Sequence, residues 1–87
     1  MATLYKMDGT VQEVKPAKGK AFTIEEMQKL VGGYVELIPS IYRPKGKLVL
    51  VDEDGIPRKK GFNIRVSQLL GIALVGDVVI CEKKEFN

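Results

Sequence analysis

The chain has 87 residues, of which 45% are apolar and 29% charged, and its formal charge is +3. This length and composition are those of one folded domain, which we place at residues 1–87. With no His, no Trp and one Cys, the sequence excludes histidine-based catalysis, histidine metal ligands and a disulfide scaffold. No apolar run approaches the roughly 20 residues that cross a bilayer, so we expect no membrane contact, no targeting segment and a cytoplasmic location.

The first predicted element is a β-hairpin. Two β-compatible segments, Thr3–Met7 and Thr10–Val14, flank the pair Asp8-Gly9. This pair is typical of a two-residue turn in which both residues take positive φ. The stretch 15–21, which contains Lys, Pro and Gly, is then predicted to be a basic loop.

A capping box marks the start of the first helix. Thr23 can accept a hydrogen bond from the amide of Glu26, whose carboxylate can reach back to the amide of Thr23. Apolar residues recur at helical spacing over the next eight positions, and Gly32-Gly33 provides a stop. We therefore predict a helix of roughly two turns.

Two strands are predicted next. Residues 34–38 alternate, with Val35 and Leu37 towards the core and Tyr34 and Glu36 on the accessible face. Residues 47–51 (KLVLV) are almost entirely apolar, which is typical of a central strand, and Asp52 to Gly55 form a turn.

The remaining elements are a second helix and two more β segments. Asn63 is a candidate N-cap for a helix over 64–70, which Gly71 ends. Residues 72–75 and 78–82 are β-type and are separated by Gly76-Asp77, either as a turn or as a bend within one strand. The order is β-β-α-β-β-α-β-β, an α+β domain with a small, mostly antiparallel sheet and both short helices on one face. Residues 84–87 are expected to be loosely ordered.

Basic residues gather in three clusters, each in a stretch that contains Gly or Pro. The clusters are Lys15, Lys18 and Lys20; Arg43, Lys45 and Lys47; and Arg58, Lys59 and Lys60. If these loops meet in space, they form an anion-facing rim suited to phosphates. The alternative is that these side chains only keep the protein soluble.

Tests for catalytic and metal motifs leave no enzyme signature. Cys81 lies in an apolar run without a histidine to activate it, which favours a packing role. The acidic run Asp52-Glu53-Asp54 lacks the ligand alternation of a calcium loop. The two Gly-Lys steps lack the rest of a phosphate-binding loop. We therefore expect no catalytic residue, no metal and no cofactor.

Five residues remain as candidate ligand-binding positions: Tyr34, Glu36, Arg43, Asn63 and Arg65. Tyr supplies a ring for stacking, Arg a planar fork for phosphate, and a helix N-terminus favours anions. The alternative is structural: Asn63 only caps its helix, and Arg65 only pairs with Glu36 or Asp77.

The segment 27–36 (MQKLVGGYVE) resembles the signature of a small domain family of unknown function, found mainly in bacteriophages, plasmids and their bacterial hosts. Asn63, Arg65 and the run 75–78 (VGDV) also fit its pattern, so the resemblance covers residues 22–82. It implies a fold and a genomic setting. Small phage proteins often act as counter-defence factors, some by sequestering nucleotide signals of bacterial immunity.

Taken together with what this resemblance implies, the sequence predicts a non-enzymatic, phage-type binding protein, a homo-oligomer in the host cytoplasm, that sequesters a small phosphorylated or cyclic nucleotide. The alternative is an accessory factor that binds nucleic acid or protein through its basic loops. A third hypothesis is a hydrolase with Glu36 or Asp77 as general base.

Overall fold

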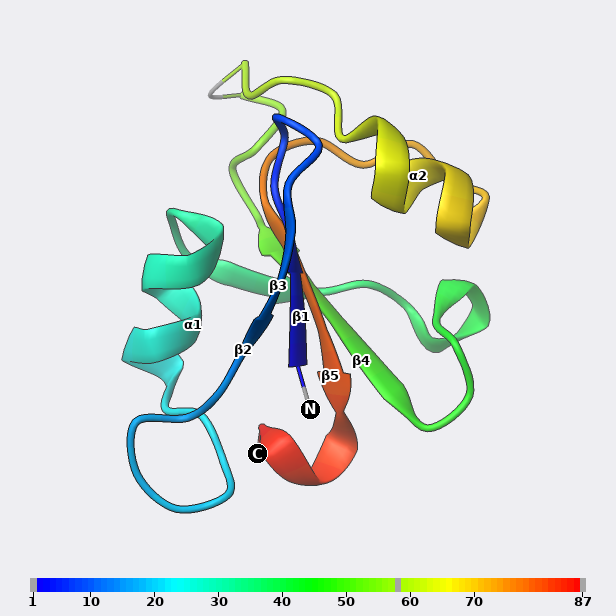
Figure 1. Ribbon diagram of the computed structural model, residues 1–87. Helices are drawn as coiled ribbons and strands as arrows, with labels where there is room; N and C mark the ends of the chain where they lie inside the picture. Colours follow the sequence, from blue (N-terminus) through cyan, green and yellow to red (C-terminus); the bar gives the residue numbers. More distant parts are fainter. Residues whose placement is uncertain (1, 58, 87) are drawn as a thin grey trace.

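The computed structural model describes residues 2–57 and 59–86, which form one antiparallel sheet and two α-helices (Figure 1). The strands are β1 (Ala2–Tyr5), β2 (Val11–Val14), β3 (Val35–Leu37), β4 (Lys47–Asp52) and β5 (Val78–Glu82), and the helices are α1 (Ile24–Val31) and α2 (Ile64–Leu70). Their order across the sheet is β2-β1-β5-β4-β3, and each neighbouring pair is antiparallel. The predicted α+β class with an antiparallel sheet is confirmed.

The first hairpin is present, but its turn differs from the prediction. β1 and β2 pair from Ala2 opposite Val14 to Tyr5 opposite Val11. The Gly9 amide donates to the Lys6 carbonyl at 3.0 Å, and Gly9 has a φ of 93°. Asp8 does not take the positive φ that we expected. The turn is longer than two residues, and one glycine in the left-handed region is enough to close it.

Both helices begin and end where the caps predict. Thr23 and Glu26 form the capping box of α1, and Gly32 ends that helix with a φ of 82°. The Asn63 side chain accepts from the Val66 amide at the start of α2, and Gly71 ends it. The local signals at these positions therefore determine the helix boundaries.

The two helices lie on opposite faces of the sheet, which corrects the expectation that both cover one face (Figure 1). Met27 and Val31 of α1 pack with Leu50 of β4, whereas Val66 of α2 packs with Val49, the preceding residue of the same strand. Successive side chains of a strand point to opposite faces. β4 and β5 are apolar along nearly their whole length and buried on both sides, so each face needs a cover.

Residues 72–75 do not form the extra strand that the sequence predicts. Within the described residues, only Val75 makes an isolated bridge, to Phe62. The backbone of Leu74 is bound to α2 instead: its amide donates to Ser67 Oγ at 2.8 Å, and its carbonyl accepts from the Asn63 amide at 2.9 Å. These bonds occupy the groups that a sheet would need.

The end of the described chain packs against the rest of the domain. Lys83–Glu85 form a 3₁₀ turn, η2, and Glu85 is buried. The Phe22 amide donates to the Glu85 carbonyl at 2.6 Å, and Phe86 packs against the core on the α1 side. Asn87 lies outside the described residues.

Candidate functional site

Tyr34 and Glu36, the two accessible side chains predicted around β3, line different depressions. Tyr34 is 64% exposed and borders a hollow at the end of α1 together with Gln28, Gly32 and Gly33. Glu36 is exposed opposite Val51 and lines a groove on the α2 side of the sheet. The structure therefore does not place these two side chains in one pocket.

Asn63 is a structural residue in the interior. It is 1% exposed, and its side-chain nitrogen donates to the carbonyls of Tyr5 and Gly76, each at 2.8 Å. Its side-chain oxygen accepts from the Val66 amide at 3.4 Å. The side chain thus joins β1, the residues before β5 and α2, and presents almost no surface to a ligand.

Arg65 is exposed on the first turn of α2. No ion pair joins it to Glu36 or Asp77 within the part of the chain that the structure describes. Asp77 instead accepts a hydrogen bond from the Met7 amide at 2.9 Å. The candidate ligand-binding residues Tyr34, Glu36 and Arg65 therefore do not share one of the described pockets.

Arg43 lies in a basic pocket that the sequence indicates only in part. The pocket has a volume of about 190 Å³. Its described lining contains four cationic residues and no acidic one: Ser40, Arg43, Pro44, Lys45, Gly46, Lys47 and Lys83. Sequence analysis missed Lys83, because its nearness to Lys47 depends on the pairing of β4 with β5, which brings Lys47 opposite Glu82.

Backbone hydrogen bonds hold the walls of the basic pocket. The 3₁₀ turn η1 (Ser40–Tyr42) closes with a bond from the Arg43 amide to the Ser40 carbonyl at 3.1 Å. The Lys47 amide donates to the Pro44 carbonyl at 3.0 Å, which forms the turn into β4. The Lys83 amide lies 3.4 Å from the Gly46 carbonyl and ties this loop to the end of β5.

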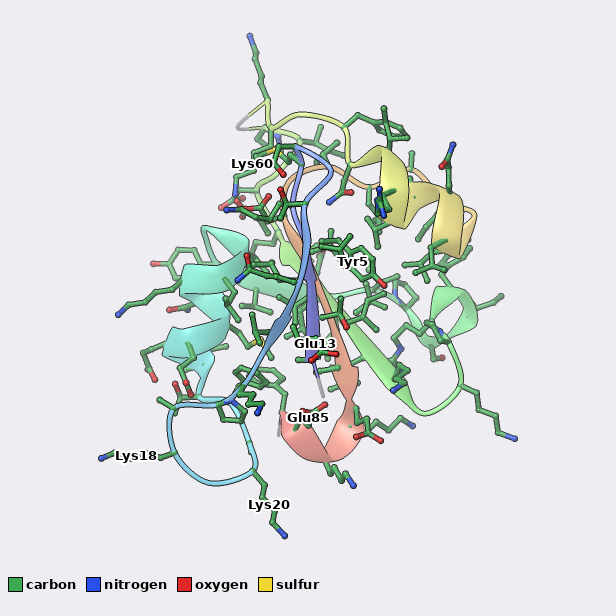
Figure 2. All side chains as sticks on the ribbon, in the orientation of Figure 1. Tyr5, Glu13, Lys18, Lys20, Lys60 and Glu85 are labelled. Carbon is green, nitrogen blue, oxygen red and sulfur yellow. The ribbon has the colours of Figure 1, made fainter. Side chains whose placement is uncertain are left out.

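The basic loops do not all meet. β2 ends, β4 begins and β5 ends at the same end of the sheet, because Ala2 pairs with Val14 and Lys47 pairs with Glu82. Lys18 and Lys20 lie at that end, and Lys60 lies at the other (Figure 2). Two of the three clusters therefore share the end that holds the basic pocket; Arg58, in the third, lies outside the described residues.

Two carboxylates at this end are bound to backbone amides. Glu26 accepts from Thr23 at 2.8 Å and from Ala17 at 2.7 Å, and these hydrogen bonds lower the pKa of its carboxyl group. Glu85 accepts from the Glu82 amide at 2.9 Å. These hydrogen bonds hold both carboxylates in place.

Cys81 and Asp52, which we considered as a nucleophile and as part of a calcium loop, are both buried and make structural contacts. Cys81 is fully buried in the core, which confirms its packing role, and burial raises its pKa to about 11. The Asp52 carboxylate pairs with Lys60 and accepts from the Asp54 amide at 2.9 Å. Across residues 2–57 and 59–86, no cluster of three or more His, Cys, Asp or Glu side chains is placed to hold a metal ion.

Neither described helix has the length and apolar character that crossing a membrane requires. A family model with the description "Domain of unknown function (DUF3846)" matches residues 4–87. No curated protein and no solved structure matches the chain.

Proposed function

Because the chain belongs to the DUF3846 family of domains of unknown function, we propose its function from its own surface: non-enzymatic binding of a phosphorylated, nucleotide-like ligand. One observation carries the proposal, namely that Arg43, Lys45, Lys47 and Lys83 line one small pocket without an acidic neighbour in its described lining. Clustered cations raise the local concentration of anions, and a guanidinium can bind two phosphate oxygens at once.

The dimensions of the basic pocket match part of a nucleotide. Ligand pockets for drug-sized molecules are usually about 300–1,000 Å³, whereas this one is about 190 Å³. It fits a phosphate group, with the rest of the ligand on the open surface beside it. Tyr42 is 48% exposed in η1, next to Arg43 in the chain, and offers a ring on which a base can stack.

The biological setting is part of the same proposal. The phage or plasmid origin, the counter-defence role and the host cytoplasm are what the resemblance of the segment 27–36 (MQKLVGGYVE) implies. Within that setting, a protein that binds a nucleotide signal without turning it over lowers the concentration of that signal. Of the five residues predicted to bind a ligand, Arg43 supports this role best, because it lines the basic pocket.

Thermal unfolding in the presence of linear and cyclic nucleotides tests the proposal. We expect one class of nucleotide to raise the Tm saturably at low ionic strength, and the double variant R43A/K47A to lose that shift. Lys29→Ala removes an exposed cation from α1 and should keep it. The ligand should be recovered chemically intact after denaturation. Equal shifts in all three proteins, or no shift with any nucleotide, would overturn the proposal.

Binding of single-stranded nucleic acid is the second candidate, because the loop with Lys15, Lys18 and Lys20 extends the basic surface at the same end of the sheet. A labelled oligonucleotide should then bind with an affinity that falls steeply with salt. Lys18→Ala and Lys20→Ala would weaken the binding of an oligonucleotide and leave the binding of a mononucleotide unchanged. Retention of oligonucleotide affinity in both variants would exclude this candidate.

Self-association of the chain also belongs to the proposal. Phe62, Ile64 and Leu69, in and beside α2, are each more than half exposed, and burying them would stabilise a small domain. Native mass spectrometry of protein from its own host reports the subunit number and any bound small molecule together. A monomer without ligand at micromolar concentration would count against both parts.

A further inference from the structure

We infer that the free edge of β3, together with the groove beside it, is a docking site for an extended segment of another protein that carries a basic residue between apolar ones. This segment would add to the sheet as a further antiparallel strand. The inference concerns a different surface from the basic pocket and does not depend on the proposed nucleotide binding.

The edge of β3 has unused backbone groups. β3 is the last strand on its side of the described sheet and pairs only with β4. The Glu53 amide donates to the Tyr34 carbonyl at 2.9 Å, and the Ile38 amide donates to the Val49 carbonyl at 3.0 Å. In an antiparallel ladder the residues between such positions point their amides and carbonyls the other way. Those of Val35 and Leu37 therefore face away from β4.

Within the described residues, these outward groups of Val35 and Leu37 have no hydrogen-bond partner. Leu37 is 45% exposed and Glu36 is also exposed, so solvent reaches this part of the strand. An edge of this kind is the template used in β-strand addition, in which main-chain bonds supply affinity and side-chain contacts supply specificity.

The groove beside this edge combines an apolar floor with acidic sides. It has a volume of about 310 Å³ and lies on the α2 side of the sheet. Ile38, Leu74 and Val75 contribute apolar surface, while Glu36 and Glu53 are exposed. Its described lining contains no basic residue, and the third acidic residue there, Asp52, is already paired with Lys60.

Glu36 determines the chemistry of the partner strand. On an added antiparallel strand, one residue lies directly opposite Glu36, and its side chain projects on the same face of the sheet. That face holds the groove, where Glu36 and Glu53 lie. A Lys or Arg at this position pairs with the acidic groups, and its apolar neighbours in the partner exchange hydrogen bonds with Val35 and Leu37.

The same geometry disfavours a second copy of this chain as the occupant. When two β3 strands pair antiparallel over their full length, Val35 lies opposite Leu37 of the other copy and Glu36 lies opposite Glu36. Like charges directly opposite each other destabilise a strand pair. The edge is therefore selective for a different sequence that supplies the missing positive charge.

Nuclear magnetic resonance with defined peptides tests this inference. The probe is the blocked peptide Ac-Thr-Val-Lys-Val-Thr-NH2, compared with a version that has Glu in place of Lys and a version methylated on both valine nitrogens. We expect the Lys peptide to shift the amide signals of Val35 and Leu37 and to slow their hydrogen exchange. It should bind about five- to tenfold more tightly than the Glu peptide, and the methylated peptide should not bind.

A charge-reversal variant separates pairing at β3 from general attraction. Glu36→Lys should prefer the Glu peptide. Glu13→Lys makes the same change at an exposed position of β2, the opposite edge strand, and should keep the preference for Lys. Equal binding of the Lys and Glu peptides, binding of the methylated peptide, or shifts confined to β2 would overturn the inference. Self-association that protects Val35 and Leu37 without peptide would also overturn it, because the occupant would then be a second copy.

Discussion

Lys60 Nζ lies 2.6 Å from Asp52 Oδ2, in an ion pair whose carboxylate is fully shielded from solvent. The same ammonium group donates to the carbonyl of Val31 at 2.9 Å and lies 3.4 Å from that of Gly32. These carbonyls are at the C-terminal end of α1, where a positive charge is favourable. The pair thus joins the end of β4, the loop before α2 and the end of α1.

Removing one partner of this pair should strongly destabilise the fold. Asp52→Ala leaves the Lys60 ammonium mostly buried without its counter-charge, and we expect a loss of about 3 kcal/mol in the free energy of unfolding. Urea denaturation measures this loss. Glu53→Ala, at the exposed neighbouring position, should change it by less than about 0.5 kcal/mol. The double variant D52L/K60M should recover most of the loss. If Asp52→Ala costs little stability and the double variant is no more stable than Asp52→Ala, the pair contributes little.

Gly33, the second residue of the double glycine, lies so close to the Asp52 carboxylate that it leaves no room for a side chain. A Cβ atom added there would stand 2.6 Å from Asp52 Oδ1, so Gly33→Ala must displace the buried carboxylate. We expect a loss of about 2 kcal/mol by chemical denaturation. Gly61→Ala is the matched control, because its Cβ would meet only Met7 Sδ, at 3.6 Å. Similar stabilities of the two variants would contradict this account.

Asn63 and Arg65, two residues apart, should respond very differently to substitution by alanine. Asn63→Ala removes an N-cap and leaves the part-buried carbonyl of Tyr5 and the buried carbonyl of Gly76 without their donor. We expect a loss of about 3 kcal/mol. Arg65→Ala should stay within about 0.5 kcal/mol of the wild type, because the side chain is exposed. Thermal and urea unfolding compare the two variants, and an Asn63→Ala protein as stable as the wild type would show that these hydrogen bonds contribute little.

Glu26 makes part of the stability depend on acid pH. Hydrogen bonds from the Thr23 and Ala17 amides lower the pKa of Glu26 below its ordinary value of 4.5. Its contribution is therefore complete above about pH 4.5 and is lost as the pH falls through the lowered pKa. Urea midpoints from about pH 6 to about pH 3 should fall less for Glu26→Gln than for the wild type. Glu25→Gln should follow the wild type, and a steeper fall for Glu26→Gln would reverse the sign of the argument.

Local chemistry made the helices predictable. The capping box at Thr23 and Glu26, the cap at Asn63 and the stops at Gly32 and Gly71 each act within one helical turn, so their residues alone determine where α1 and α2 begin and end. The apolar run in β4 likewise marks a central strand. The same run carries the signal that both faces of the sheet are covered, since a strand that is apolar at successive positions has no solvent face.

The candidate site depends on contacts between residues that are far apart in the sequence, which the sequence alone does not reveal. Arg43 lies beside Lys83 because β4 and β5 pair, and Lys60 reaches Asp52 because the chain folds back over the end of α1. The helix cap predicted at Asn63 is correct. The side chain that was expected to bind a ligand is buried, however, and its nitrogen donates hydrogen bonds to the carbonyls of Tyr5 and Gly76. Short-range hydrogen bonds, such as helix caps, depend on residues that are neighbours in the sequence and can be predicted from them. The position of a charge in space depends instead on which strands pair. Strand pairing is determined by the packing of the whole core.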